Sequence, residues 1–392
     1  MRVAAAPPPR RVVAALGITQ IVSWGVLYYA FPVLAVPISA DTGWSMPAVT
    51  GAFTLGLITA ALVGIPVGRI LDKRGPWLIM TCGSALATVA VLGVATATHL
   101  GAFIAAWLLA GISMSGTLYP PAFAAVTRWF PGSSRVRALT ALTLAGGLAS
   151  TVFAPLTATL AEHFDWRGAY LLLATVLAAV TLPIHLLCLR RPWPALSHSA
   201  PARDRSVVYT RTFLMLAAAF TLSAFALYSV VISLVPLLTG RGASLSVAAW
   251  ALGLGGIGQV IGRVSYGLLA RRVQPGPRTV AVFALGGATT ALLGATPGPI
   301  ALLVAIAMIA GAARGISTLL QATAVTERWG TARYGTLSAA LGAPVTVAIA
   351  LAPWASASVA AFVGGYPELF GALALVSLTA AALAIAARPM GP

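Results

Sequence analysis

Two stretches of this sequence, 200 residues apart, decide the fold. Residues 102–129 read AFIAAWLLAGISMSGTLYPPAFAAVTRW, and residues 302–329 read LLVAIAMIAGAARGISTLLQATAVTERW. Each stretch is long and apolar enough to cross about 30 Å of hydrocarbon as a helix. The matched positions are Ala110, Gly111, Ala122, Ala124, Arg128 and Trp129 in the first stretch and Ala310, Gly311, Ala322, Ala324, Arg328 and Trp329 in the second. The Arg-Trp pair carries most of the weight, because alanine-rich segments match by chance. The chain therefore predicts an internal repeat of membrane-spanning helices.

The composition of the whole chain supports this class. Of 392 residues, 59% are hydrophobic and only 8% are charged, with a mean hydropathy of +0.94. A soluble domain carries about 25% charged residues, and the strands of a membrane β-barrel are short alternating segments of about ten residues. We expect an all-α membrane protein with twelve transmembrane helices in two pseudo-symmetric six-helix bundles. The expected ranges are 12–38, 47–71, 77–98, 102–127, 138–160, 168–189, 212–238, 246–269, 279–296, 299–327, 334–361 and 368–387.

The repeat also sets the expected domain organisation. Residues 1–189 form the first six-helix half and 212–392 the second, and the polar stretch 190–211, rich in Pro, Ser and Arg, reads as a cytoplasmic linker. Six helices repeated in one orientation imply a pseudo-two-fold axis along the membrane normal. Carriers built this way bind substrate near the midplane and rock one half against the other.

The positions of the basic residues indicate how the chain is oriented in the membrane. The formal net charge is +17, and nearly all of the 24 Lys and Arg residues fall at or beside one set of loops. Only Arg167 and Arg241 fall on the opposite side, and Arg314 lies within a helix. The positive-inside rule then puts both termini in the cytoplasm, so the charge is not the footprint of a nucleic-acid partner. We expect a multi-pass protein of the bacterial cytoplasmic (inner) membrane.

The loop after the second expected helix carries a recognisable motif. It runs Gly68-Arg-Ile-Leu-Asp72-Lys73-Arg74-Gly75. This resembles the cytoplasmic signature of the major facilitator superfamily, although Pro76 and Trp77 replace its final basic pair. The resemblance implies that Gly68, Asp72, Lys73, Arg74 and Gly75 form a conformational latch. The alternative is an ordinary solvated turn.

Three shorter patterns resemble one branch of that superfamily. They are Gly43-Trp44-Ser45, Trp129-Phe130-Pro131 with Arg135 and Arg137, and Asp165-Trp166-Arg167-Gly168. They look like the bacterial branch related to monocarboxylate carriers and oxalate/formate antiporters. The resemblance implies the major facilitator fold and transport by alternating access.

One ionisable residue is expected deep in the membrane. All seven acids sit at helix ends or in loops, whereas Arg314 lies mid-way along the tenth expected helix. Intramembrane charges are costly and are functional candidates by default. A guanidinium offers a planar donor fork that suits a carboxylate. The alternatives for Arg314 are a structural or gating role, or a depth nearer the surface. Arg263, in the eighth helix beside Gln259, is expected near the cytoplasmic end.

The remaining candidate substrate contacts are neutral. Ser317 and Gln321 share a helix face with Arg314 by three-four spacing. Aromatic rings with polar tips suit a small organic solute, although they serve equally as interhelical packing. These candidates are Gln20, Trp24, Tyr28, Tyr119 and Tyr228.

The predicted function is a secondary transporter for a small organic solute, an anion such as a monocarboxylate. The close rival is an efflux carrier for drug-like or natural-product molecules, suggested by Gly146, Gly147, Ala154 and Pro155 in the fifth helix. No motif of an intramembrane enzyme or an ATP-binding loop is present. We expect no catalytic residue, cofactor or metal. The expected partners are the solute, the lipid bilayer, and either a proton or a counter-anion, with the protein acting as a monomer.

Overall fold

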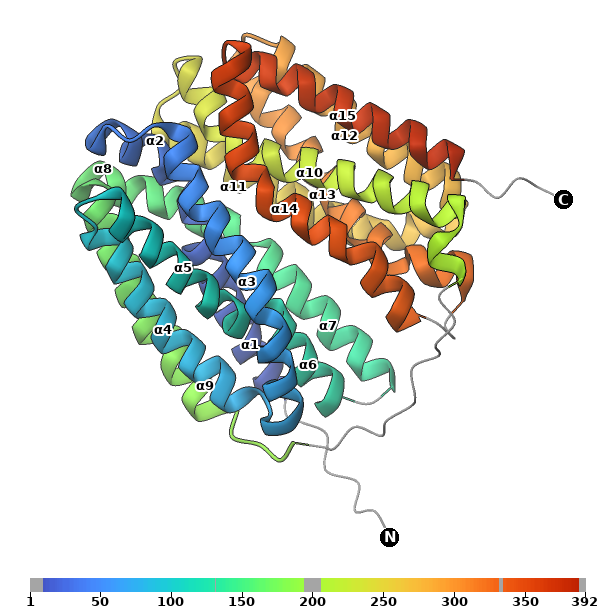
Figure 1. The fold of residues 1–392 in the computed structure, drawn as a ribbon, viewed down its shortest axis with the longest axis horizontal. Coiled ribbons are helices and arrows are strands. Elements are labelled where there is room, and N and C mark those ends of the chain that lie inside the picture. Colours follow the sequence, from blue (N-terminus) through green and yellow to red (C-terminus); the bar gives the residue numbers. More distant parts are fainter. Residues whose placement is uncertain (1–9, 131, 194–205, 331–333, 388–392) are drawn as a thin grey trace, which may run out of the picture. The chain divides into compact units, whose positions relative to one another are not determined.

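The computed structural model describes residues 10–130, 132–193, 206–330 and 334–387, and within these ranges every regular element is a helix (Figure 1). The chain folds into two compact units, Met1–Ser197 and His198–Pro392. The boundary between them lies in 194–205, outside the described residues. The two termini, which the orientation argument placed in the cytoplasm, also lie outside them.

The first unit holds helices of very different length. They are α1 (Arg10–Trp24), the π-helix η1 (Gly25–Tyr29), α2 (Ala30–Thr42), α3 (Met46–Arg74), α4 (Pro76–Thr96), α5 (Leu100–Thr117), α6 (Tyr119–Trp129), α7 (Gly132–Gly147), α8 (Ala149–Val176), the π-helix η2 (Leu177–Thr181) and α9 (Leu182–Cys188).

The second unit is simpler. It contains the short 3-10 helix η3 (Ser206–Tyr209), then α10 (Arg211–Gly240), α11 (Leu245–Arg272), α12 (Pro275–Ala295), α13 (Ile300–Trp329), α14 (Tyr334–Val363) and α15 (Tyr366–Ala386).

Eleven helical segments of the described chain are long and apolar enough to cross a membrane. One of them, Ser134–Cys188, has 55 residues and takes in two of the expected helices. It bends at Asp165, whose φ of 58° is left-handed. An aspartate tolerates this conformation better than most residues, and its Oδ1 accepts a hydrogen bond from Gly168 N at 2.8 Å. The bend therefore starts a new helical run inside one continuous segment.

Glycines hold neighbouring helices together in both units. In the first, a Cβ on Gly111 of α5 would overlap the backbone of Gly56 in α3. In the second, a Cβ on Gly311 of α13 would overlap the backbone of Gly255 in α11. Small residues of this kind let membrane helices approach until their backbones touch. The two contacts occupy matching places in the repeat, so the repeated sequence codes for a repeated helix packing.

The two arginines predicted on the outer side each bind a helix end. Arg167 Nη1 donates to the carbonyls of Ala95 and Ala97, 3.0 and 2.7 Å away, where α4 ends. Arg241 Nη1 and Nη2 donate to the carbonyls of Leu293 and Gly294 where α12 ends. The last carbonyls of a helix have no partner within it and attract a cation. These arginines are thus part of the fold.

The start of the expected linker packs on the first unit. The Trp193 ring lies 5.9 Å from that of Trp129, and Trp129 Nε1 donates to the carbonyl of Pro192 at 3.2 Å. Residues 190–193 therefore belong structurally to this unit.

Candidate functional site

Arg314 lies half-way along the 30-residue helix α13 and is only 7% exposed. Its Nε and Nη2 atoms are buried and have no hydrogen-bond partner in the part of the chain that the structure describes. Glu327, on the same helix, is thirteen residues or about 20 Å away along the axis. A buried guanidinium whose donors are unmet is costly, so Arg314 is a candidate ligand-binding residue.

The predicted polar residues of the second unit gather around Arg314. A cavity of about 60 Å³ is lined by Arg314, Ser317 and Gln321 of α13 together with Tyr228 of α10. The Ser317 hydroxyl is buried there without a partner among the described residues. A single water needs about 10–15 Å³, so this space has room for a few waters or one small polar group. Four of the expected substrate contacts therefore share one cavity.

A second, smaller cavity touches Arg314 from the other direction along α13. It measures about 20 Å³ and is lined almost entirely by apolar residues, among them Leu252, Ala307 and Ala310. Leu227 lines both cavities. Arg314 and Leu227 thus lie between a cavity of mixed polar and apolar lining and one that is almost entirely apolar.

The packing of α11 on α13 corrects the expected position of Arg263. A Cβ on Gly262 would overlap the Ala312 backbone, and a Cβ on Gly315 would overlap that of Gln259. Arg263 therefore lies within about one turn, or 5.4 Å, of the level of Arg314. It is 9% exposed. The sequence expectation placed it near the cytoplasmic end because sequence alone does not give the register between two helices.

The predicted residues of the first unit form an aromatic cluster. The Trp24 ring lies 5.6 Å from that of Tyr28 and 5.1 Å from that of Tyr119. Trp24 Nε1 is buried and makes no hydrogen bond within the described residues. Gln20, one turn earlier, donates from Nε2 to the carbonyl of Thr117 at 2.8 Å.

Sequence reasoning missed the π-helix that carries this cluster. Residues Gly25–Tyr29 widen to π-helical geometry directly after Trp24. A Cβ on Gly25 would overlap the Phe153 ring of α8, so only glycine admits this ring. Single π-turns inside α-helices are frequent at functional sites. The only sequence signal was the glycine itself, in a chain that has 39 of them.

The motif, which the sequence placed in a loop, is helical up to Arg74: its residues form the last turns of α3, and only Gly75 lies beyond the helix end. It makes specific contacts. Asp72 Oδ1 lies 2.5 Å from Arg128 Nη2, at the end of α6. The Asp72 carbonyl accepts from Arg128 Nη1 at 3.1 Å and from Trp193 Nε1 at 3.0 Å. Gly75 has a φ of +80°, and a Cβ there would press on the Trp193 ring at 3.1 Å. Lys73 and Arg74 are exposed, and Gly68 has open space around it.

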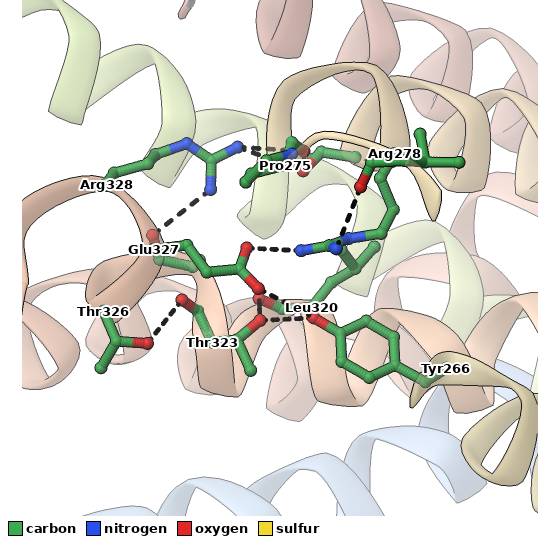
Figure 2. A network of polar contacts seen from close by, with 11 residues as sticks. Tyr266, Pro275, Arg278, Leu320, Thr323, Thr326, Glu327 and Arg328 are labelled. Atoms are coloured by element: carbon green, nitrogen blue, oxygen red, sulfur yellow. Dashed lines mark hydrogen bonds and ion pairs between the residues drawn. The ribbon is translucent and has the colours of Figure 1, made fainter. Parts of the chain in front are cut away.

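The second unit has its own charged network, which the sequence did not reveal. Figure 2 shows Glu327 of α13 between Arg278 of α12 and Tyr266 of α11. Glu327 Oε2 lies 2.5 Å from Arg278 Nη2, and the Tyr266 hydroxyl lies 2.5 Å from Thr323 Oγ1. Arg328 donates to Thr279 Oγ1 at 3.2 Å instead of to a carboxylate.

A family model described as Major Facilitator Superfamily matches residues 16–339. This chain belongs to the major facilitator superfamily. It is therefore a multi-pass membrane protein of a transporter family, as the motif loop indicated.

Two of the similar proteins are named monocarboxylate transporters. The chain is 32% identical over 224 residues to monocarboxylate transporter 13 of Rattus norvegicus, a match covering 55% of this chain and 50% of that protein. It is 30% identical over 274 residues to monocarboxylate transporter 11 of Homo sapiens, covering 67% and 55%. The chain thus spans about half the length of the curated relatives it matches.

Solved structures agree on the fold. A bacterial homologue of the human lysosomal transporter Spinster, in an inward-facing and occupied conformation, superposes with a TM-score of 0.77 over 96% of both chains. The sequences are 17% identical. The likeness shows a shared major facilitator fold.

Proposed function

We propose that this protein is a secondary transporter that carries a small organic anion, such as a monocarboxylate, by alternating access. The observation that carries the proposal is Arg314, a buried cation with unmet donors beside a polar cavity. Arg263, within about one turn of that level on the packed helix α11, adds positive potential. The names of the relatives favour the same solute class.

The proposal includes twelve crossings in two six-helix bundles, 1–189 and 212–392, joined by the linker 190–211. A helical segment of 55 residues would rise about 80 Å if it were straight, at 1.5 Å per residue. One crossing needs only about 30 Å, so we count this segment as two crossings separated by the bend at Asp165. The distribution of Lys and Arg favours cytoplasmic termini in the inner membrane of a bacterium.

The two halves have different roles in this proposal. Arg314, Ser317, Gln321 and Tyr228 hold the anion, and the first-unit residues Gln20, Trp24, Tyr28 and Tyr119 provide shape and neutral contacts. The motif Gly68, Asp72, Lys73, Arg74 and Gly75 acts as the latch: the ion pair of Asp72 with Arg128 ties the end of α3 to the end of α6 and opens when these ends part. No enzyme activity, cofactor or metal is part of the proposal, and the working unit is a monomer.

The test is uptake of labelled carboxylates into proteoliposomes at subsaturating concentration. Charged hydrogen bonds contribute about 1.5–3 kcal/mol, so we expect Arg314→Ala to lower uptake about 10- to 100-fold. Arg314→Lys keeps the positive charge but loses the planar arrangement of donors, so its uptake rate should lie between those of Arg314→Ala and the wild type. The matched control is Arg272→Ala, an exposed arginine on α11, which should transport normally. Anion uptake by Arg314→Ala at the wild-type rate would refute the proposed site.

The same proteoliposomes also test the rival function and identify the coupling partner. Export of neutral or cationic drug-like compounds, with no anion uptake, would favour the efflux carrier. An imposed proton gradient that drives uptake identifies a symporter. Acceleration by an anion loaded inside identifies an exchanger.

A further inference from the structure

Trp193, at the start of the linker, touches both partners of the Asp72–Arg128 ion pair. Its Nε1 donates to the Asp72 carbonyl at 3.0 Å, and its ring centre lies 4.3 Å from Arg128 Cζ. An indole face attracts a guanidinium that lies over it. The Arg128 side chain is only 6% exposed, although that of Asp72 is 59% exposed. The ring therefore helps to keep water from the cation, which strengthens its attraction to the carboxylate.

Gly75, the last residue of the motif, makes room for this ring. Its φ of +80° is left-handed, a conformation that glycine adopts at no steric cost. A Cβ there would lie 3.1 Å from Trp193 Cγ and 3.3 Å from Trp193 Cβ, so the ring would have to shift by a few tenths of an ångström. The motif thus contacts the linker through two of its residues, Asp72 and Gly75.

Neighbouring residues hold the linker in this place. Trp129, next to Arg128 in the sequence, donates from Nε1 to the Pro192 carbonyl at 3.2 Å, and its ring meets that of Trp193 edge to face at 5.9 Å. Leu189 is fully buried in the same apolar cluster as Trp129. The segment 189–193 is therefore fixed beside the ion pair by its backbone as well as by its side chains.

We propose that Trp193 is a positioning residue of the latch, which holds Arg128 in place for Asp72 and attaches the linker to the end of α3. Because the linker is the covalent connection to the second unit, release of Trp193 and opening of the ion pair become one step. Coupling of this kind is reciprocal, so loosening either contact loosens the other. The inference rests on the latch role proposed above, and it is independent of any solute carried at Arg314.

The test is hydrogen–deuterium exchange, read by mass spectrometry, on the full chain in phosphatidylcholine nanodiscs. Exchange in 68–75 reports opening at the end of α3, and exchange in 189–193 reports release of the linker. The measurement needs no solute, so failure of the proposed anion site in the uptake assay would leave it intact.

Variants of Trp193 separate its two contacts. Trp193→Phe keeps a ring over Arg128 but loses the hydrogen bond to Asp72, so 68–75 should exchange about fivefold faster. Trp193→Ala also loses the cation–π contact, a further factor of about two to five, so the total should be about 10- to 25-fold. If the alanine variant does not fold, the phenylalanine variant still gives the result.

The reciprocal variant acts on the ion pair. Asp72→Asn should speed exchange in 189–193 about two- to fivefold, as expected for a partly exposed pair, and should also speed exchange in 68–75. Unchanged exchange in 68–75 would refute the latch itself, and the inference with it. Faster exchange in 68–75 with no change in 189–193 would overturn the coupling to the linker alone.

Trp166→Ala is the matched control. Trp166 makes the same two kinds of contact elsewhere in the unit, because its Nε1 donates to Asp41 at 2.9 Å and its ring centre lies 4.2 Å from Arg167 Cζ. We expect this variant to leave exchange in 68–75 and 189–193 unchanged. Equal acceleration of 68–75 by Trp166→Ala and Trp193→Ala would indicate only a general loss of stability and would overturn the proposal. Wild-type exchange in 68–75 of both Trp193 variants would do the same.

Discussion

Two ion pairs of the same length provide a direct test of how burial sets their strength. Arg128–Asp72 and Arg278–Glu327 both measure 2.5 Å between nitrogen and oxygen. The Asp72 side chain is 59% exposed, whereas that of Glu327 is 24% exposed and that of Arg278 only 2%. We expect Glu327→Gln to destabilise the protein much more than Asp72→Asn.

The magnitudes follow from the surroundings. Charges about 4 Å apart attract by about 4 kcal/mol where the effective dielectric constant is about 20, and by about 1 kcal/mol in water. The glutamine of Glu327→Gln keeps one neutral hydrogen bond, worth about 1 kcal/mol, so the expected loss is about 3 kcal/mol. After Asp72→Asn, Arg128 still has the Asp72 carbonyl and the Trp193 ring 4.3 Å away. The expected loss there is about 1 kcal/mol or less.

The assay is a pair of double-mutant cycles on the purified protein in detergent, with unfolding followed by tryptophan fluorescence against denaturant. One cycle combines Glu327→Gln with Arg278→Gln, and the other combines Asp72→Asn with Arg128→Gln. Such cycles isolate the pairwise energy of each pair. We expect coupling of about 3 kcal/mol in the first and about 1 kcal/mol in the second. Equal coupling energies would refute the reasoning from burial.

Two further predictions concern the packing of each unit. Gly258→Leu forces a side chain into the α13 backbone, so the variant should not elute as a monodisperse protein on size exclusion. Its control is Gly267→Leu, at a position with no neighbour within 4 Å. That variant should change stability by no more than about 0.5 kcal/mol. Trp166→Phe removes the 2.9 Å hydrogen bond from Nε1 to Asp41 Oδ2 and should lower the unfolding free energy by about 1.5 kcal/mol, the low end for a charged acceptor, because the Asp41 side chain is 56% exposed. Trp250→Phe, at a ring that is 52% exposed, is its control, and an equal loss there would contradict the hydrogen-bond explanation.

The sequence predicted helices well and contacts poorly. Apolar length and the 200-residue repeat were enough to locate the helices and to recognise the family, because each crossing has to satisfy its backbone internally and is therefore visible in the sequence. The candidate residues Arg314, Ser317 and Gln321 of α13 line one cavity, as their three-four spacing within that one helix predicted. Arg263 and the partner of Glu327 did not follow, because both depend on the register between different helices. That register is set by contacts at particular glycines, and the sequence does not show which glycines make them.

The two units share one arrangement of helices, but the acid and the base of their ion pairs occupy exchanged positions. In the first unit the acid, Asp72, ends α3 and its base, Arg128, ends α6. In the second the base, Arg278, starts α12 and its acid, Glu327, lies near the end of α13. Arg328 repeats Arg128 in sequence but binds a hydroxyl and carbonyls. Each unit thus keeps an ion pair between corresponding regions although neither residue of the pair is retained. A tie between helix ends is therefore present in both units, whereas the buried charge of Arg314, with Met114 at the matching position, belongs to one unit alone.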